Sequence, residues 1–139
     1  MSFMFRSSTF KLPFLTGILS VIFFYSCNSL PGDGGTSTIT GKVFVQEYNA
    51  SGTLFADYYG ADQHVYLIYG DGTVYNDDIR TSYDGTYEFN FLRKGNYQVF
   101  AYSDCIGCDG GSVPVIINIE ITKNNETVTA PDIVIDKRN

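Results

Sequence analysis

From residue 39 onward, hydrophobic and polar positions alternate with a period of two in short runs. These runs are rich in Val, Ile, Tyr, Phe and Thr, and clusters of Gly, Asp and Asn separate them. Side chains of a strand point alternately to its two faces, so this period is typical of half-buried β-strands. The runs lie at residues 38–45, 64–69, 73–81, 86–91, 97–102, 113–121 and 128–135. No run has the helical period.

Seven short strands separated by turn clusters predict an all-β fold, a seven-stranded antiparallel sandwich of two sheets over residues 39–136. A closed up-and-down barrel is the alternative that periodicity leaves open. Pro131 predicts a bend in the last run, because it removes a ladder donor. In two of the runs the predicted core faces hold Val65, Leu67 and Tyr69, and Tyr97, Val99 and Ala101.

The N-terminus has the pattern of a signal peptide over residues 1–26. Arg6 and Lys11 precede the apolar stretch "LPFLTGILSVIFF", which is shorter than a membrane-spanning helix requires. The "FYSC" that follows resembles the bacterial lipoprotein box, and this resemblance implies that Cys27 is lipidated and becomes the mature N-terminus. A plain secretory signal and a single-pass membrane segment are the alternatives. Asn28 resembles the outer-membrane sorting pattern, so we expect attachment to the membrane through the lipid, in the cell envelope and on the outer membrane.

Residues 27–38 are expected to be the lipidated cysteine and a flexible tether, because residues 28–38 are rich in Gly, Ser and Thr and contain no aromatic residue. The whole chain has a net charge of −6. Seven Lys and Arg and all fifteen Asp and Glu follow residue 26, so the mature chain carries −8. Nucleic acid and anionic lipid surfaces are poor partners for such a chain.

The stretch "TSYDGTYEFNFLRKGNY", residues 81–97, is similar to the signature of carboxypeptidase regulatory-like domains, which have a transthyretin-like (prealbumin-like) sandwich with an Ig-like architecture. The matching positions are Thr81, Asp84, Gly85, Tyr87, Phe89, Leu92, Gly95 and Tyr97, and "GADQHVYL" adds Gly60, Ala61, Val65 and Leu67. The resemblance implies a structural domain that is not itself a catalyst. It also implies that the Tyr97 hydroxyl caps nearby backbone, as in a tyrosine corner.

Cys105 and Cys108 form a C-x-x-C pair between two predicted strands. A redox dithiol normally begins a helix, and a zinc site needs two more ligands, whereas the chain offers only His64 as a histidine. A structural disulfide is therefore favoured over both, and no cofactor or metal is expected. The loop residues Asp71, Asp77, Asp78 and Asp84 are read as solvated turn acids, with calcium binding as the open alternative.

Residues 46–63 form a long polar connection that nevertheless holds the large rings of Phe55, Tyr58 and Tyr59. Such rings need either a core or a partner, so these three are the candidate binding residues, for a protein or a glycan of the envelope. The alternative is that they cover the edge of the sandwich. The sequence thus favours a non-catalytic, lipid-anchored binding or scaffolding module over an enzyme. A purely structural lipoprotein and a thiol-disulfide redox protein are the runners-up.

Overall fold

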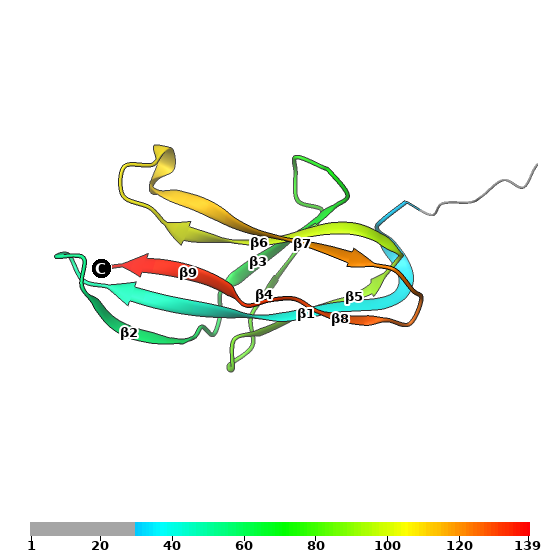
Figure 1. The fold of residues 1–139 in the computed structure, drawn as a ribbon, viewed down its shortest axis with the longest axis horizontal. Helices are drawn as coiled ribbons and strands as arrows, with labels where there is room; N and C mark the ends of the chain where they lie inside the picture. Colours follow the sequence, from blue (N-terminus) through cyan, green and yellow to red (C-terminus); the bar gives the residue numbers. More distant parts are fainter. Residues whose placement is uncertain (1–29) are drawn as a thin grey trace, which may run out of the picture.

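The computed structural model describes residues 30–139, and these form two β-sheets packed face to face as a sandwich (Figure 1). The predicted signal peptide and Cys27 lie outside the described residues. The all-β sandwich is confirmed. Its strands are β1 (Asp33–Tyr48), β2 (Leu54–Tyr59), β3 (His64–Tyr69), β4 (Asp77–Arg80), β5 (Thr86–Leu92), β6 (Gly95–Asp104), β7 (Ser112–Ile121), β8 (Thr127–Thr129) and β9 (Ile133–Arg138).

Within residues 30–139 there are therefore nine strands where seven were predicted. Strand β2 lies in the segment that was expected to be a polar connection. It was not predicted because an edge strand exposed on both faces shows no hydrophobic alternation. The last predicted strand is divided into β8 and β9 around Pro131. The expectation of wholly antiparallel pairing is also wrong, because β8 and β9 both run parallel to β1.

Strand β1 organises the first sheet. It spans 16 residues, or about 50 Å of extended chain, so four shorter strands share it. Its first half pairs with β5 and β8, and its second half pairs with β2 and β9. The second sheet has the order β4-β3-β6-β7.

The predicted tether, residues 27–38, is too long, because residues 33–38 belong to strand β1. Gly35 lies so close to the backbone of Leu92 that a Cβ atom would overlap the Leu92 carbonyl. The Ser37 hydroxyl is buried and donates to the carbonyl oxygen of Lys123 at 2.9 Å. The small residues that suggested flexibility are needed here for a close approach between strands.

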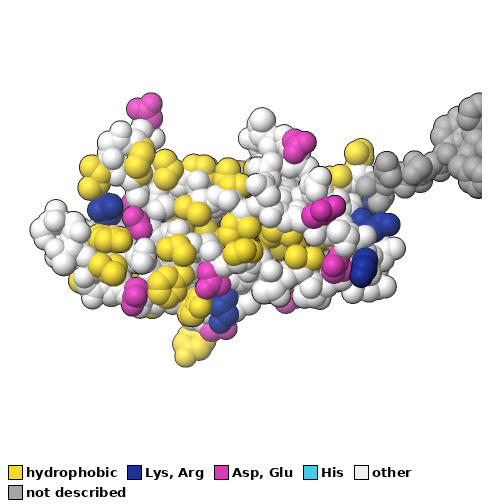
Figure 2. Space-filling model, in the orientation of Figure 1, with side chains coloured by type: hydrophobic (Ala, Val, Ile, Leu, Met, Phe, Trp, Pro, Cys, Tyr) yellow, Lys and Arg dark blue, Asp and Glu magenta, His cyan; other side chains and the backbone are white. Residues whose placement is uncertain are grey.

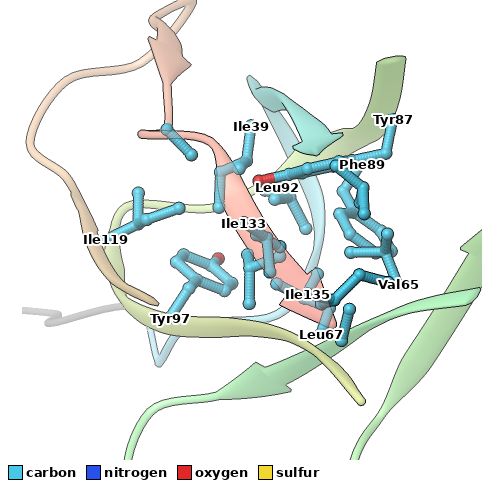
Figure 3. Close-up of a cluster of buried hydrophobic side chains, with 14 of the residues drawn as sticks. Ile39, Val65, Leu67, Tyr87, Phe89, Leu92, Tyr97, Ile119, Ile133 and Ile135 are labelled. Carbon is cyan, nitrogen blue, oxygen red and sulfur yellow. The ribbon is translucent and has the colours of Figure 1, made fainter. Parts of the chain in front are cut away.

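The core fills the space between the sheets with aliphatic side chains and a few rings (Figure 3). Its fully buried members include Ile39, Val43, Val65, Leu67, Val99, Ile121, Ile133 and Ile135. They come from β1, β3, β6, β7 and β9, at alternate positions of each strand. The predicted core faces of β3 and β6 are confirmed, except that Tyr69 is only half-buried.

Tyr97 fastens the N-terminal segment to one end of the sandwich. Its hydroxyl donates to the Arg93 carbonyl at 2.7 Å and accepts from the Gly32 N–H at 2.9 Å. The expected backbone-capping role of Tyr97 is therefore observed. At the same end, the Tyr69 hydroxyl donates to the Asp33 carboxylate at 2.7 Å. The C-terminus and the β6–β7 loop lie at the opposite end (Figure 1).

Candidate functional site

The three predicted binding residues lie on edge strand β2 and are all exposed, by 55% for Phe55, 42% for Tyr58 and 45% for Tyr59. The structure does not bring them onto one surface. Tyr58 and Tyr59 are neighbours in a strand, so their side chains point to opposite faces. Phe55 lies where the β1–β2 register shifts at a bulge.

The two tyrosine hydroxyls already have partners within the protein. The Tyr59 hydroxyl donates to Asp132 at 3.0 Å, and the Tyr58 hydroxyl donates to Glu47 at 2.7 Å. Each carboxylate raises the pKa of its tyrosine, because the hydrogen bond favours the protonated phenol. The Tyr59 ring also meets Phe44 edge-on at 5.3 Å, and the Lys42 ammonium lies 4.8 Å from its centroid. Although Tyr59 is exposed, its ring and its hydroxyl both make contacts within the sheet.

A larger group of rings lies on the outward face of the other sheet. We name it the Tyr66 cluster, and its members are His64, Tyr66, Tyr75, Phe100 and Tyr102. Tyr66 is at its centre, with ring centroids 5.0 Å from Phe100, 5.0 Å from Tyr75, 5.7 Å from Tyr102 and 5.8 Å from His64.

The register of β3 and β6 creates this cluster. Tyr66 pairs with Phe100 across the two strands, and their rings stack with an interplanar angle of 18°. Tyr75 comes from the loop between β3 and β4 and meets the Tyr66 ring edge-on. Phe100 is 6% exposed, whereas Tyr75 and Tyr102 are 50% and 47% exposed. The cluster therefore has a buried base and two rings open to solvent.

The predicted binding residues do not include this cluster, although the residue order contains a signal for it. The period of two assigns one face of each strand to the core, and the cluster lies on the other face. In "HVYLIY" and "YQVFAY" the remaining face holds Tyr66, Ile68, Phe100 and Tyr102, where a solvent-facing strand would carry polar side chains. Rings and aliphatic residues on both faces of two paired strands were the sign of a second apolar surface.

A cleft of about 220 Å³ opens beside the cluster. It is lined by three rings, by one aliphatic residue and by three polar residues: His64, Tyr66, Tyr102, Ile135, Asp62, Gln63 and Lys137. The Asp62 carboxylate forms an ion pair with the Arg80 guanidinium at 2.9 Å. The Nδ1 atom of His64 lies 3.4 Å from the Asp78 carboxylate. Burial raises the pKa of Tyr66, and the nearby Asp78 raises it further.

This lining offers both kinds of contact that a sugar needs. Aromatic faces pack on the C–H groups of a sugar ring, and carboxylate, amide and ammonium groups bind its hydroxyls. Figure 2 shows a face of the molecule on which His64 is not visible; on that face hydrophobic side chains gather along the length of the molecule, with acidic and basic side chains scattered among them. Among residues 30–139, no group of three or more His, Cys, Asp or Glu is placed to hold a metal ion.

Cys105 and Cys108 are joined by a disulfide in the loop between β6 and β7, with Cα atoms 5.7 Å apart. A single 3-10 turn (Asp109–Gly111) follows them in the described chain. The turn is too short to act as the helix that lowers a thiol pKa in redox proteins. Of the acidic loop residues, Asp84 pairs with Lys42 at 3.1 Å and Asp78 with His64, so the two are not left as free oxygen ligands.

No protein-family model and no curated protein matches the chain. Among solved structures, it is similar to a crystal structure from Pseudomonas aeruginosa described as a "putative carbohydrate binding protein". The two share 15% sequence identity with a TM-score of 0.45, over 76% of this chain and 91% of the other. So distant a likeness carries no inference about function. In the described part of the chain, no helix has the length and apolar character to cross a membrane.

Proposed function

We propose that this protein is a non-catalytic, lipid-tethered binding module of the cell envelope that binds a glycan at the Tyr66 cluster. The observation that carries the proposal is the convergence of five rings on an exposed sheet face, beside a cleft with three polar side chains. A surface of that kind is costly to leave in water, and natural proteins keep one where a ligand uses it.

The charge of the molecule narrows the glycan class. The mature chain carries −8, and Asp62 and Asp78 lie beside the cluster, where they contact Arg80 and His64. A polyanionic glycan would be repelled at long range by this field. Neutral or amino sugars are therefore the expected ligands. Tyr75 and Tyr102 are the exposed rings that stack on the sugar, and Gln63 and Lys137 are the polar groups at the cleft that bind hydroxyls.

The tether belongs to the same proposal. Acylation at Cys27 attaches the chain to the membrane, on the outer membrane if the Asn28 sorting pattern holds. The described chain then enters at the end of the sandwich where Tyr97 and Tyr69 bind Gly32 and Asp33, at the start of β1. The cleft is lined by the first residues of β3 and the last residues of β6 and β9, and so lies away from the tethered end.

The relation to carboxypeptidase regulatory-like domains is also part of the proposal, and the local geometry of the motif supports it. The Thr81 hydroxyl donates to the Gly60 carbonyl at 2.6 Å and accepts from the Gln63 N–H at 2.9 Å. Asp84 accepts from the Ser82 and Thr86 hydroxyls in the turn that follows. These residues have structural duties, as the resemblance implies.

The test uses the soluble domain, residues 28–139, which contains the whole core. We expect it to bind a neutral or amino-sugar oligosaccharide on a glycan array, with the affinity then measured by calorimetry. Tyr102→Ala and Tyr75→Ala should each weaken binding about tenfold, because one lost stacking contact is worth about 1.4 kcal/mol. Tyr83→Ala is the matched control, since Tyr83 is 93% exposed and lies outside the cluster.

Equal binding by Tyr102→Ala and wild type would contradict the glycan site. So would the absence of any bound glycan on the array. In that case the second candidate, a protein partner on β2, becomes the better one, and its motivation is the exposure of Phe55 and its neighbour Leu54. Joint replacement of Phe55, Tyr58 and Tyr59 by Ala should then change the set of proteins that the domain retains in a pull-down. An unchanged set would leave only a structural role.

A further inference from the structure

Strand β7 forms one end of the β4-β3-β6-β7 sheet, so half of its backbone groups have no strand partner among residues 30–139. Cys105 N–H donates to the Gly111 carbonyl at 2.9 Å, which fixes the alternation along the β6–β7 hairpin. The odd-numbered residues of β7 therefore bond to β6, and the even-numbered ones turn their N–H and C=O groups to the free edge. Pro114, which has no N–H, is one of these even residues, as expected for an edge strand.

The free edge is unusually apolar for an exposed strand. Val113, Pro114, Val115, Ile116 and Ile117 are consecutive, and all five are half-buried or exposed. Val113 and Ile116 are exposed by 38% and 47%. Natural edge strands are usually short, bulged or protected by lysine, but β7 is ten residues long and contains no lysine or arginine. Apart from Pro114, only Glu120 near its end protects it.

We propose that β7 pairs antiparallel with β7 of a second copy of this chain. The charge of the molecule limits where a second copy can bind. Two chains of net charge −8 repel each other over most of their surfaces, whereas β7 carries a single charge and is a segment on which they can meet. Glu120 is the only charged residue of the strand. Antiparallel pairing centred on Ile117 sets Glu120 opposite Pro114 of the other copy and keeps the two carboxylates apart.

The pairing also covers the exposed side chains on both faces of the strand. Ile116 points to the outward face, where it neighbours Phe100, and Val115 and Ile117 point to the inward face. The partner strand adds the same residues on the same faces, because a twofold axis perpendicular to a sheet preserves its two faces. The N–H groups of Ile116 and Asn118 then gain acceptors.

The dimer has one consequence for glycan binding, and this consequence rests on the proposed function. It joins the two sheets into a continuous sheet of eight strands, with both Tyr66 clusters on one face. Five strand spacings separate the clusters, or about 24 Å. A polymeric glycan that reaches both clusters would bind more tightly than a short one, because the second contact is intramolecular.

The test is the mass of the soluble domain, residues 28–139, measured by sedimentation equilibrium over a wide range of concentrations without glycan. We expect twice the monomer mass for the wild type. Ile116→Lys should give the monomer, because it places like charges in the paired edge. Asn118→Pro should also give the monomer, because it removes a free-edge donor and leaves the β6 ladder intact. Circular dichroism checks that each variant is folded.

Val134→Lys is the matched control, since Val134 is a strand residue of the other sheet with 43% exposure, and this variant should remain a dimer. A wild-type chain that is monomeric at every concentration overturns the proposal. A dimer that survives in folded Ile116→Lys overturns it as well. Because no glycan is present, the result is independent of the proposed function. Loss of glycan binding in a domain that still dimerises would reject only the glycan site.

Discussion

Tyr87 shows how one residue pair sets the packing between β1 and β5. Tyr87 lies opposite Gly41 in the register, and its ring crosses the strand where a Cβ atom on residue 41 would overlap the hydroxyl. The side chain is 1% exposed, and its hydroxyl has no hydrogen-bond partner among residues 30–139. Burial raises the pKa of this phenol above its usual value of 10.0, and the nearby Asp132 adds to the effect. The ring fills space in the core, whereas the buried hydroxyl without a hydrogen-bond partner lowers the free energy of unfolding.

Tyr87→Phe should therefore raise the free energy of unfolding by about 1 kcal/mol at pH 7, because it removes a buried polar atom without leaving a cavity. The gain should grow above pH 10. There the unfolded wild type releases the phenol proton while the folded state, with its raised pKa, retains it, so wild-type stability falls as pH rises through this window. Below pH 10 both states are protonated and the contribution is complete.

Urea denaturation of wild type and variant at neutral pH and above pH 10 measures both effects. Tyr66, Tyr69 and Tyr97 also have raised pKa values, so above pH 10 they lower the stability of wild type and variant equally. The difference between the two unfolding free energies therefore isolates Tyr87. A variant that is clearly less stable than wild type at pH 7 would show that the hydroxyl makes a favourable contact.

At the scale of elements, the β6–β7 hairpin combines a long regular ladder with a loop closed by a disulfide. The two strands pair without interruption from Gly95 and Ile121 to Asp104 and Ser112. The loop beyond them holds Cys105 and Cys108 together with three glycines, Gly107, Gly110 and Gly111, that adopt positive φ. The disulfide therefore closes only a very small ring on a hairpin that the ladder already defines.

The double variant Cys105→Ser/Cys108→Ser should keep its fold and lose about 2 kcal/mol of stability or less, because a small ring restricts the unfolded chain little. Thermal unfolding followed by circular dichroism measures this loss. The denatured, unreduced wild-type domain should show no free thiol at either position. The domain should also fail to reduce insulin, and insulin reduction that disappears in Cys105→Ser would place the protein among redox enzymes.

At the scale of the whole molecule, the sandwich has one end where the described chain enters and an opposite end where it finishes. The chain enters beside Tyr97 and Tyr69, whereas the disulfide loop and the C-terminus lie at the other end (Figure 1). Strand β1 alone runs for about 50 Å between them. If Cys27 carries the lipid, the opposite end is presented well away from the membrane surface.

The lipid is tested with the full chain expressed in a bacterial host that is supplied with labelled fatty acid. We expect label on the wild type and in its membrane fraction, and no label on Cys27→Ala, because the thiol is the attachment point. Cys105→Ala/Cys108→Ala is the matched control and should keep the label. Equal labelling of wild type and Cys27→Ala would reject the lipid anchor.

The period-two alternation was enough to predict the all-β sandwich and the inward faces of β3 and β6, because burial on one face leaves a direct record in the residue order. The turn at Asp84–Gly85 and the capping hydroxyl of Tyr97 were expected from the resemblance of residues 81–97 to the carboxypeptidase regulatory-like signature and not from the alternation. Strand β2 could not be predicted, because an edge strand with two exposed faces has no such alternation.

Cross-strand register was decided only by the tertiary structure. Residue order places Tyr66, Tyr75 and Phe100 far apart, and only the pairing of β3 with β6 and the return of the next loop bring their rings together. The parallel pairing of β8 and β9 with β1, and the free edge of β7, are likewise properties of sheet order. Local pattern specifies which face of a strand is buried and can indicate a second apolar face, but contacts between distant strands depend on how the whole chain packs, so only the folded molecule shows which rings meet in one site.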